Sequence, residues 1–362
     1  FGWGIRHTLA EHLRQNFTPN FVVITSKTLA QPGQFTDQLL QQLDSTAVLT
    51  FEVSGEPSPE LVDDIVKQCS IETSVVVAIG GGSVMDAGKA IAGLIPSQTS
   101  VMDYLEGVGK GLVFDQLTTP FLAVPTTAGT GSETTKNSVL SQIGHFKKSF
   151  RDNRLLAKEA WLDPELLESC PKTVLYATGL DAFTQLLESY TTLKSNPMTD
   201  ALAWQGMQYF IDAFSKVDSN DRALRQEGLG NLMLAASLSG ITLANAGLGA
   251  VHGLAGPVGA FFEAPHGIVC AKLLAPITKA NISAMQTSNE TTHQFALAKY
   301  RQVSQLLHPD KSFTSDAQAY QALIDYLEGL SAKYAPQGLS QYGLNNKNLS
   351  QVINNCRSGS ML

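Results

Sequence analysis

The feature that most constrains the fold is an apolar run at residues 74–79 that ends directly in Gly80, Gly81 and Gly82. Residues 75–79 carry no polar side chain, which is typical of a strand buried on both faces of a parallel sheet. The three glycines allow the backbone to turn sharply. We expect Ser83 to open a helix there and to form a capping box with Asp86. The order of strand, turn and helix predicts an α/β domain.

The rest of the chain divides into two parts with different patterns of predicted secondary structure. Strand-like runs at 21–25, 47–51 and 121–124 alternate with helical patterns at 34–43 and 57–69, as in a doubly wound sheet. After Asp163 and Pro164 strand-like runs nearly vanish. The patterns that follow predict helices at 175–192, 198–216, 222–244, 295–307 and 315–334. We therefore predict a boundary between residues 163 and 164.

Composition limits the partners of the chain. Its 362 residues suggest two domains at ~150 residues each, and the net charge of −7 argues against nucleic acid. No stretch approaches the ~20 apolar residues of a membrane span. The four cysteines are far apart and form no CxxC pair, which favours reduced thiols and a cytoplasmic protein. They are Cys69, Cys170, Cys270 and Cys356.

Two polar loops follow two of the predicted strands. The first, at Gly80–Ser83, precedes a helix whose N-terminus can hold a pyrophosphate. The second runs from Pro125 to Glu133 and contributes the hydroxyls of Thr126, Thr127, Thr130 and Ser132. Each loop alone also fits an ordinary helix start. Together, at the carboxyl ends of two strands, they predict a nucleotide site.

Candidate metal ligands lie in the second half of the chain. Asp181 and Gln185 are four residues apart and share a helix face, with Glu188 near it. His252 and His266 stand in mostly apolar segments. Each histidine alone fits a packed residue bonded to a carbonyl, but with Asp181 they offer one oxygen and two nitrogens, which suits Zn²⁺ or Fe²⁺. Cys270 fits a buried small hydrophobe better than a soft ligand.

These motifs, in this order, resemble the iron-containing (group III) alcohol dehydrogenase family. The resemblance rests on Phe1-Gly2-Trp3-Gly4, Gly80-Gly81-Gly82-Ser83 with Asp86 and Lys89, Pro125 through Glu133, Val251-His252-Gly253 and Pro265-His266-Gly267. It implies a dehydroquinate synthase-like fold: a doubly wound dinucleotide-binding domain over residues 1–163 and an all-helical metal and substrate domain over 164–362. It also implies the NAD(P)-dependent oxidation of a small alcohol or the reduction of an aldehyde.

The resemblance places the divalent ion, Fe²⁺ first and Zn²⁺ second, on Asp181, His252 and His266. The family's fourth ligand is a histidine, where this chain has Gln185, whose carbonyl oxygen is a weaker donor. Metal identity and occupancy therefore stay open. A second departure is Gly256, where many relatives carry a histidine that helps to move the proton. The proton would then leave through water or a ribose hydroxyl, and Gly256 with Pro257 predicts a backbone break that opens room for substrate.

The resemblance also assigns the cofactor residues. Asn137 and Lys148 match positions near the nicotinamide. Ser26 stands where NAD-preferring relatives often carry Asp, so NAD and NADP are held equal. Lys148 would polarise the carbonyl if no metal were used. The predicted cofactor-binding residues are Ser26, Gly80, Gly81, Gly82, Ser83, Asp86, Thr126, Thr127, Thr130, Ser132, Asn137 and Lys148.

Three other functions are alternatives to the dehydrogenase. A dehydroquinate synthase-like lyase needs a basic pocket, whereas segment 240–275 has Lys272 alone and no arginine. A glycerol dehydrogenase-like enzyme fits the loop at 125–133 less well. A catalytically impaired dinucleotide-binding relative is the third alternative, because two expected histidines are missing. We further expect a homodimer with no nucleic-acid or membrane partner.

Overall fold

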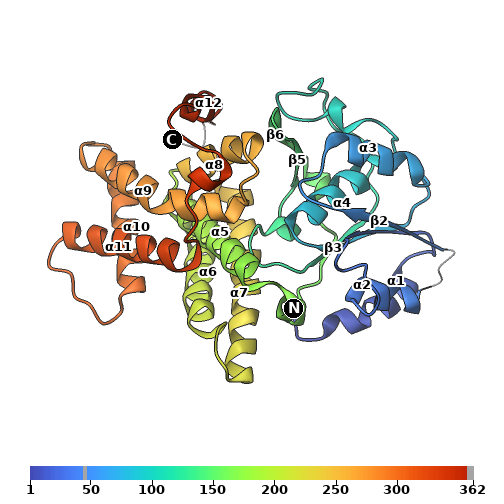
Figure 1. Cartoon of the computed structure of the whole chain (residues 1–362), viewed down its shortest axis with the longest axis horizontal. Coiled ribbons are helices and arrows are strands. Elements are labelled where there is room, and N and C mark those ends of the chain that lie inside the picture. Colours follow the sequence, from blue (N-terminus) through green and yellow to red (C-terminus); the bar gives the residue numbers. More distant parts are fainter. Residues whose placement is uncertain (44–46, 357–362) are drawn as a thin grey trace. The chain divides into compact units, whose positions relative to one another are not determined.

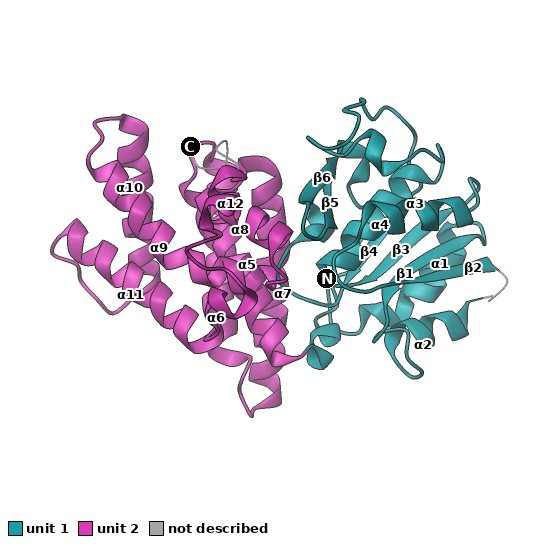
Figure 2. Cartoon of the chain, turned by 45° about the horizontal axis from the view of Figure 1, so that its top comes forward, with its two compact units in different colours: residues 1–170 teal, residues 171–362 magenta. Residues whose placement is uncertain are grey.

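We describe a computed structural model of the chain, which places residues 1–43 and 47–356 (Figure 1). The chain forms two compact units, residues 1–170 and 171–362, and each is described by itself (Figure 2). The boundary predicted from the sequence lies seven residues before the observed one. Residues 357–362 of the predicted second domain lie outside the described residues.

Unit 1 is built on a five-stranded parallel sheet in the order β2-β1-β3-β4-β7. Its strands are β1 (Phe21–Ser26), β2 (Val48–Val53), β3 (Val75–Gly80), β4 (Phe121–Pro125) and β7 (Glu159–Ala160). The four strands predicted from the sequence are confirmed. The prediction missed β7 because two residues carry no alternating pattern, and pairing with β4 is what makes them a strand.

Helices cover both faces of this sheet, which confirms the doubly wound fold. Val22 and Ile24 pack with α3 and α4, whereas Val23, between them in sequence, packs with α1 and α2 on the opposite face. The helices are α1 (Leu9–Asn16), α2 (Phe35–Gln42), α3 (Pro59–Gln68) and α4 (Gly82–Leu94). The short 3₁₀ turns are η1 (Ile5–Thr8), η3 (Val101–Asp103), η4 (Ser132–Thr134), η5 (Asn153–Leu155) and η6 (Pro164–Ser169).

A two-stranded antiparallel sheet was missed by the sequence prediction. It joins β5 (Asn137–Gln142) to β6 (Phe146–Arg151), and β5 lies next to α4. The connecting turn is closed by the His145 N–H, which donates to the Gln142 carbonyl at 2.9 Å. Gly144 supports the turn with a φ of +84°.

The described residues of unit 2 form helices and connecting loops without strands, as predicted. They are α5 (Lys172–Thr191), α6 (Pro197–Lys216), α7 (Arg222–Ala246), α8 (Ala250–Phe261), α9 (His266–Gln286), α10 (Thr291–Leu307), α11 (Asp316–Tyr334), η7 (Leu339–Tyr342) and α12 (Leu349–Asn354). The five predicted helices are confirmed, and α8, α9 and α12 are additional.

The backbone break predicted at Gly256 and Pro257 is wrong. Pro257 lies inside α8, where it removes one helical N–H and the helix continues to Phe261. Pro257 is itself buried, so packing stabilises the helix around it. A Cβ placed on Gly256 would meet nothing within 4 Å, so open space does exist at this position.

Two helices of unit 2, α7 and α9, are long and apolar enough to cross a membrane by length and composition alone. In the structure 61% and 44% of their tested windows are buried inside the protein, and the core helix of a folded protein passes the same test.

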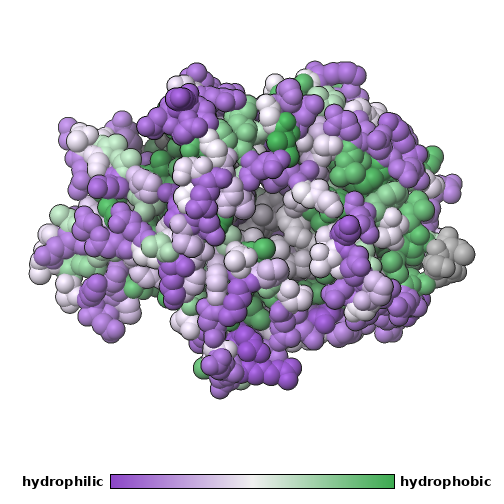
Figure 3. Space-filling view, in the orientation of Figure 1, coloured by the Kyte–Doolittle hydropathy of each residue, from purple (hydrophilic) through white to green (hydrophobic). Residues whose placement is uncertain are grey.

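The turn between α6 and α7 is strongly hydrophilic (Figure 3), and there Lys216 lies 2.8 Å from Asp212 and 2.7 Å from Glu227. The expectation of no membrane partner stays a prediction.

Candidate functional site

The sheet of unit 1 has a topological switch between β1 and β3. The chain passes from β1 outward to β2, then returns across β1 to β3. Ligands of open α/β sheets bind beyond the carboxyl ends of the strands at such a point. Ser26 ends β1 and Gly80 ends β3, so two of the predicted cofactor residues flank the switch.

The two polar loops of unit 1 touch each other. A Cβ on Gly81 would lie 3.3 Å from Thr127 Oγ1, and a Cβ on Gly82 would lie 2.8 Å from Thr130 Cγ2. The Thr126 N–H donates to the Gly80 carbonyl at 2.9 Å. Because Gly81 is the N-cap of α4 and has no capping side chain, the first-turn N–H groups can receive an anion. These contacts bring the glycine and threonine residues into one group.

The capping box predicted for Ser83 and Asp86 is wrong. Helix α4 begins at Gly82, so Ser83 lies inside the first turn and not at the cap. The Asp86 carboxylate instead accepts from the Ser132 hydroxyl, with Oδ1 and Oγ 2.6 Å apart. Asp86 therefore holds the second loop against α4.

Lys89 is fully buried and fastens the same loop. Its ammonium donates to the Ser132 carbonyl at 2.9 Å, to Thr135 Oγ1 at 3.0 Å and to the Asn137 carbonyl at 2.5 Å. Burial lowers the pKa of Lys89, and the nearby Asp86 opposes that shift. Burial also raises the pKa of Glu133 in this loop to about 7. Lys89 and Asp86 therefore position the loop, and their contacts within unit 1 account for their burial without a ligand.

The structure does not bring Asn137 and Lys148 together. In the β5–β6 pairing Asn137 stands opposite Arg151, and Lys148 stands opposite Leu140. Because alternate residues of a strand point to opposite faces, these two predicted residues lie on opposite faces of the hairpin. Lys147 shares the face of Asn137, but its ammonium pairs with Glu56 at 2.8 Å.

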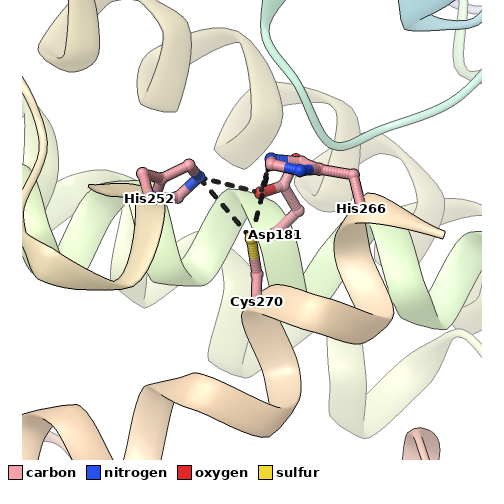
Figure 4. A group of neighbouring side chains, drawn as sticks. All are labelled: Asp181, His252, His266 and Cys270. Atoms are coloured by element: carbon pink, nitrogen blue, oxygen red, sulfur yellow. Dashed lines mark hydrogen bonds and ion pairs between the residues drawn. The ribbon is translucent and has the colours of Figure 1, made fainter. Parts of the chain in front are cut away.

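Three helices of unit 2 bring four potential metal ligands together (Figure 4). Asp181 comes from α5, His252 from α8, and His266 and Cys270 from α9. One potential ligand atom from each residue lies within 4.8 Å of the others. Asp181 Oδ1 lies 3.2 Å from His252 Nε2 and 3.6 Å from His266 Nε2. Three of the four are the ligands predicted from the sequence.

Local sequence explains how the helices come so close. Gly267 follows His266, and a Cβ there would collide with the Ala177 carbonyl of α5, so only glycine fits at this crossing. A Cβ on Gly249, just before α8, would lie 2.7 Å from Glu188 Oε1. Glycine at both positions therefore permits the α5–α9 approach and the approach of α8 to Glu188.

Glu188 orients His252. Its Oε2 lies 2.6 Å from His252 Nδ1, and its Oε1 accepts from the Val251 N–H at 2.7 Å. With Nδ1 held by a carboxylate, Nε2 faces Asp181 and the other donors. Carboxylates arranged in this way fix the tautomer of metal-binding histidines.

Gln185 is turned away from the role predicted for it. Its amide nitrogen donates to Asp181 Oδ2 at 3.3 Å, and its oxygen accepts from the Ser239 hydroxyl at 2.9 Å. The oxygen that would have to bind an ion is therefore engaged by α7. Gln185 instead restrains one carboxylate oxygen of Asp181, which leaves the other facing the histidines.

The charges of this group already suit a cation. Burial alone would raise the pKa of Asp181, but the charge of His266 and the hydrogen bond from His252 outweigh it and lower the value to about 2. Burial opposes the protonation of His252, yet Cys270, Asp181 and Glu188 raise its pKa well above the usual value. Burial raises the pKa of the Cys270 thiol to about 12. A divalent ion that binds here would compete with a proton for His252.

Comparison with known proteins identifies the family. The family model for iron-containing alcohol dehydrogenases matches residues 1–164, and the model for the C-terminal part of Fe-containing alcohol dehydrogenases matches residues 175–358. The chain belongs to the iron-containing alcohol dehydrogenase family. It is thus an oxidoreductase that interconverts an alcohol and a carbonyl compound, and the family implies NAD(H) and a divalent metal.

Relatives of this family extend along most of the chain. Alcohol dehydrogenase 4 of Saccharomyces cerevisiae is 31% identical over 288 residues, which is 78% of this chain and 73% of the relative. Long-chain-alcohol dehydrogenase 1 of Geobacillus thermodenitrificans is 31% identical over 350 residues, 95% and 84% of the two chains. The crystal structure of a 1,3-propanediol oxidoreductase superposes with a TM-score of 0.83 at 26% identity, covering 100% and 92%.

Sequence reasoning misses the positions of three residues in this iron-containing alcohol dehydrogenase. The sequence predicts a buried hydrophobe at Cys270 and assigns no role to Glu188, and Lys89 of unit 1 is named only as part of a motif. Cys270 stands four residues after His266, so a helix beginning at His266 would have placed both on one face. Nothing in the sequence alone pairs Glu188 with His252, because 64 residues separate them.

Proposed function

We propose that this chain catalyses metal-assisted hydride transfer between NAD(P) and a small alcohol or aldehyde. The observation that supports this most is the convergence of Asp181, His252 and His266 in unit 2. One carboxylate and two imidazoles are a donor set that divalent iron and zinc accept. The residues present therefore fit the metal that the family implies.

The chain's own residues would hold that ion and exclude water from it. Asp181 is 1% exposed, so its charge acts in a medium of low polarity. Glu188 keeps the proton of His252 on Nδ1, which leaves the lone pair of Nε2 free to bind the ion. A divalent ion bound there supplies Lewis acidity, which favours the alkoxide in oxidation and polarises the carbonyl in reduction.

The cofactor would be bound in unit 1. The N-terminus of α4 at Gly81 and Gly82 fits the pyrophosphate, and the hydroxyls of Thr127 and Thr130 lie beside it. Ser26 ends β1 and carries no charge, so a 2′-phosphate is permitted as readily as a free ribose hydroxyl. The redox chemistry itself belongs to the nicotinamide. We therefore keep NAD and NADP as equal candidates.

Four further expectations are part of the proposal. The spacing of the cysteines supports a cytoplasmic location, and we expect a homodimer. We also keep Fe²⁺ and Zn²⁺ as the candidate ions. The excess of acidic over basic residues supports the expectation that no nucleic acid binds.

The test compares wild type with His266→Ala in aldehyde reduction, using NADH and NADPH separately. Metal is measured by elemental analysis before and after dialysis against a chelator. We expect dialysis to remove both metal and turnover, readdition to restore them, and His266→Ala to lack both. His293→Ala is the matched control, because His293 lies elsewhere in unit 2 beside Ser288.

Full turnover without metal, unchanged in His266→Ala, would contradict the metal-assisted reaction. Lys148 would then be the candidate to polarise the carbonyl. Cofactor binding without turnover of any aldehyde would instead indicate a catalytically impaired relative.

A further inference from the structure

We propose that Cys270, and not Gln185, supplies the fourth protein ligand of the metal centre. The site is then a carboxylate, bis-imidazole and thiolate site that favours Zn²⁺ over Fe²⁺. This inference rests on the proposed metal-dependent function and makes it more specific.

The position of the Cys270 sulfur supports this assignment. Its Sγ lies 3.6 Å from His266 Nε2 and 3.7 Å from His252 Nε2. In a tetrahedral site with Zn–S near ~2.3 Å and Zn–N near ~2.05 Å, sulfur and nitrogen stand ~3.6 Å apart. Figure 4 shows the sulfur pointing at the same space as the carboxylate and both rings. The sulfur thus stands from both ring nitrogens at the separation expected of ligands of one ion.

The separations among the other donors agree with the same geometry. Nitrogen and oxygen ligands of a tetrahedral zinc ion lie ~3.4 Å apart. Asp181 Oδ1 stands 3.2 Å and 3.6 Å from the two Nε2 atoms. These two oxygen–nitrogen separations therefore also fit ligands of one ion, and all four ligand atoms lie within 4.8 Å of one another.

Gln185 is engaged by hydrogen bonds of its own, which hold its oxygen away from the fourth position. Its oxygen accepts from Ser239, and its nitrogen donates to Asp181 Oδ2. Without a bound ion, reversing the amide would set its oxygen against the Asp181 oxygen at that 3.3 Å separation, where two acceptors repel each other. Gln185 is thus a positioning residue for Asp181.

The environment of Cys270 also differs from that of an inert core cysteine. The residue is fully buried on α9, yet its sulfur contacts two imidazole nitrogens and lies in the carboxylate group. Cys69, also buried, belongs to a hydrophobic cluster of unit 1 instead. The sulfur of Cys270 therefore has polar neighbours suited to a thiolate ligand.

Thiolate ligation changes the chemistry of the site. As the sulfur–metal bond forms, the S–H bond breaks and its proton passes to solvent, with no change in oxidation state. Two anionic ligands then balance the charge of the divalent ion. Soft thiolate donors favour zinc, and zinc can accept a fifth ligand, so substrate can still bind.

The decisive measurement is X-ray absorption of the zinc-loaded full chain. We expect one sulfur neighbour at about 2.3 Å and nitrogen or oxygen neighbours at about 2.0–2.2 Å. Cys270→Ser should lose the sulfur neighbour, whereas the matched control Cys356→Ser should keep it. Gln185→Ala should also keep it.

Two further readouts do not depend on turnover. Cobalt-loaded wild type should show a thiolate-to-cobalt charge-transfer band in the near ultraviolet, absent in Cys270→Ser alone. In anaerobic competition between Zn²⁺ and Fe²⁺, Cys270→Ser should shift the preference toward iron by at least ~10-fold.

The outcomes separate this inference from the proposed function. Bound zinc with no sulfur neighbour in wild type would overturn the role of Cys270 and leave metal-assisted catalysis standing. Full turnover with no metal bound would overturn the proposed function itself. If Cys270→Ser does not fold, the wild-type and Gln185→Ala spectra still decide the question.

Discussion

Replacing Glu188 with Gln tests whether that carboxylate controls the metal centre. Glu188 uses one oxygen for the Val251 N–H at 2.7 Å and the other for His252 Nδ1 at 2.6 Å. Glutamine is isosteric but offers one acceptor and one donor. If its oxygen stays on Val251, its amide faces Nδ1, which must then accept and leave the proton on Nε2. That tautomer cannot bind an ion through Nε2.

The reverse orientation of the amide is also unfavourable, because it sets two donors against each other at Val251. Either way we expect the metal dissociation constant of Glu188→Gln to rise by ~10–100-fold, roughly 1.4–2.7 kcal/mol. The assay is competition with a calibrated chelator at fixed pH. Nitrogen-15 chemical shifts of His252 in the metal-free protein report its tautomer.

The matched control is Glu227→Gln, which removes a carboxylate of the same unit that pairs with Lys216 away from the site. Its metal affinity should equal that of wild type. A folded Glu188→Gln protein with wild-type metal affinity and an unchanged His252 tautomer would refute the positioning role of Glu188.

Three other predictions concern unit 1. Gly81→Val adds a branched side chain at a position where even a Cβ would lie 3.3 Å from Thr127. Calorimetry should therefore show the free energy of cofactor binding weakened by ~1–3 kcal/mol, with the metal content unchanged. Normal cofactor affinity would contradict the assignment of this loop to the phosphates. Ser26→Asp should weaken NADP more than NAD by ~1–3 kcal/mol, and equal weakening would show that residue 26 does not contact the ribose. Burial raises the pKa of Glu133 from 4.5 to about 7. The contribution of its protonated form to the free energy of unfolding is therefore fully present below pH 4.5 and is lost as pH rises through about 7. Urea unfolding of wild type should therefore lose about 3 kcal/mol over that range relative to Glu133→Gln, and parallel pH profiles would contradict the shift.

Much of unit 1 could be predicted because its signals are local. The buried strand at 75–79 and the glycines after it specify a strand, a turn and a helix within a few residues. The capping box failed because α4 begins at Gly82, one residue before Ser83, and a side chain one position inside a helix no longer caps it.

The metal centre was only partly predictable, because its geometry depends on distant parts of the chain. Helices α8 and α9 contain Gly256, Pro257 and Pro276, which lower helix propensity, and packing stabilises them nevertheless. The role of Gln185 depends on Ser239, 54 residues away. Residue types identified Asp181 and the histidines as candidates, but only the folded chain shows which atoms face them.

An ion bound by Asp181 on α5 and Cys270 on α9 would also act as a cross-link. Asp181 and Cys270 are far apart in sequence, so an ion that holds both prevents α5 and α9 from separating unless it is released first. An ion that binds only the folded state stabilises it by ~2.7 kcal/mol when free metal is 100 times the dissociation constant. The melting temperature of unit 2 should therefore rise with free metal concentration, and heat resistance should report how much of a preparation carries its ion.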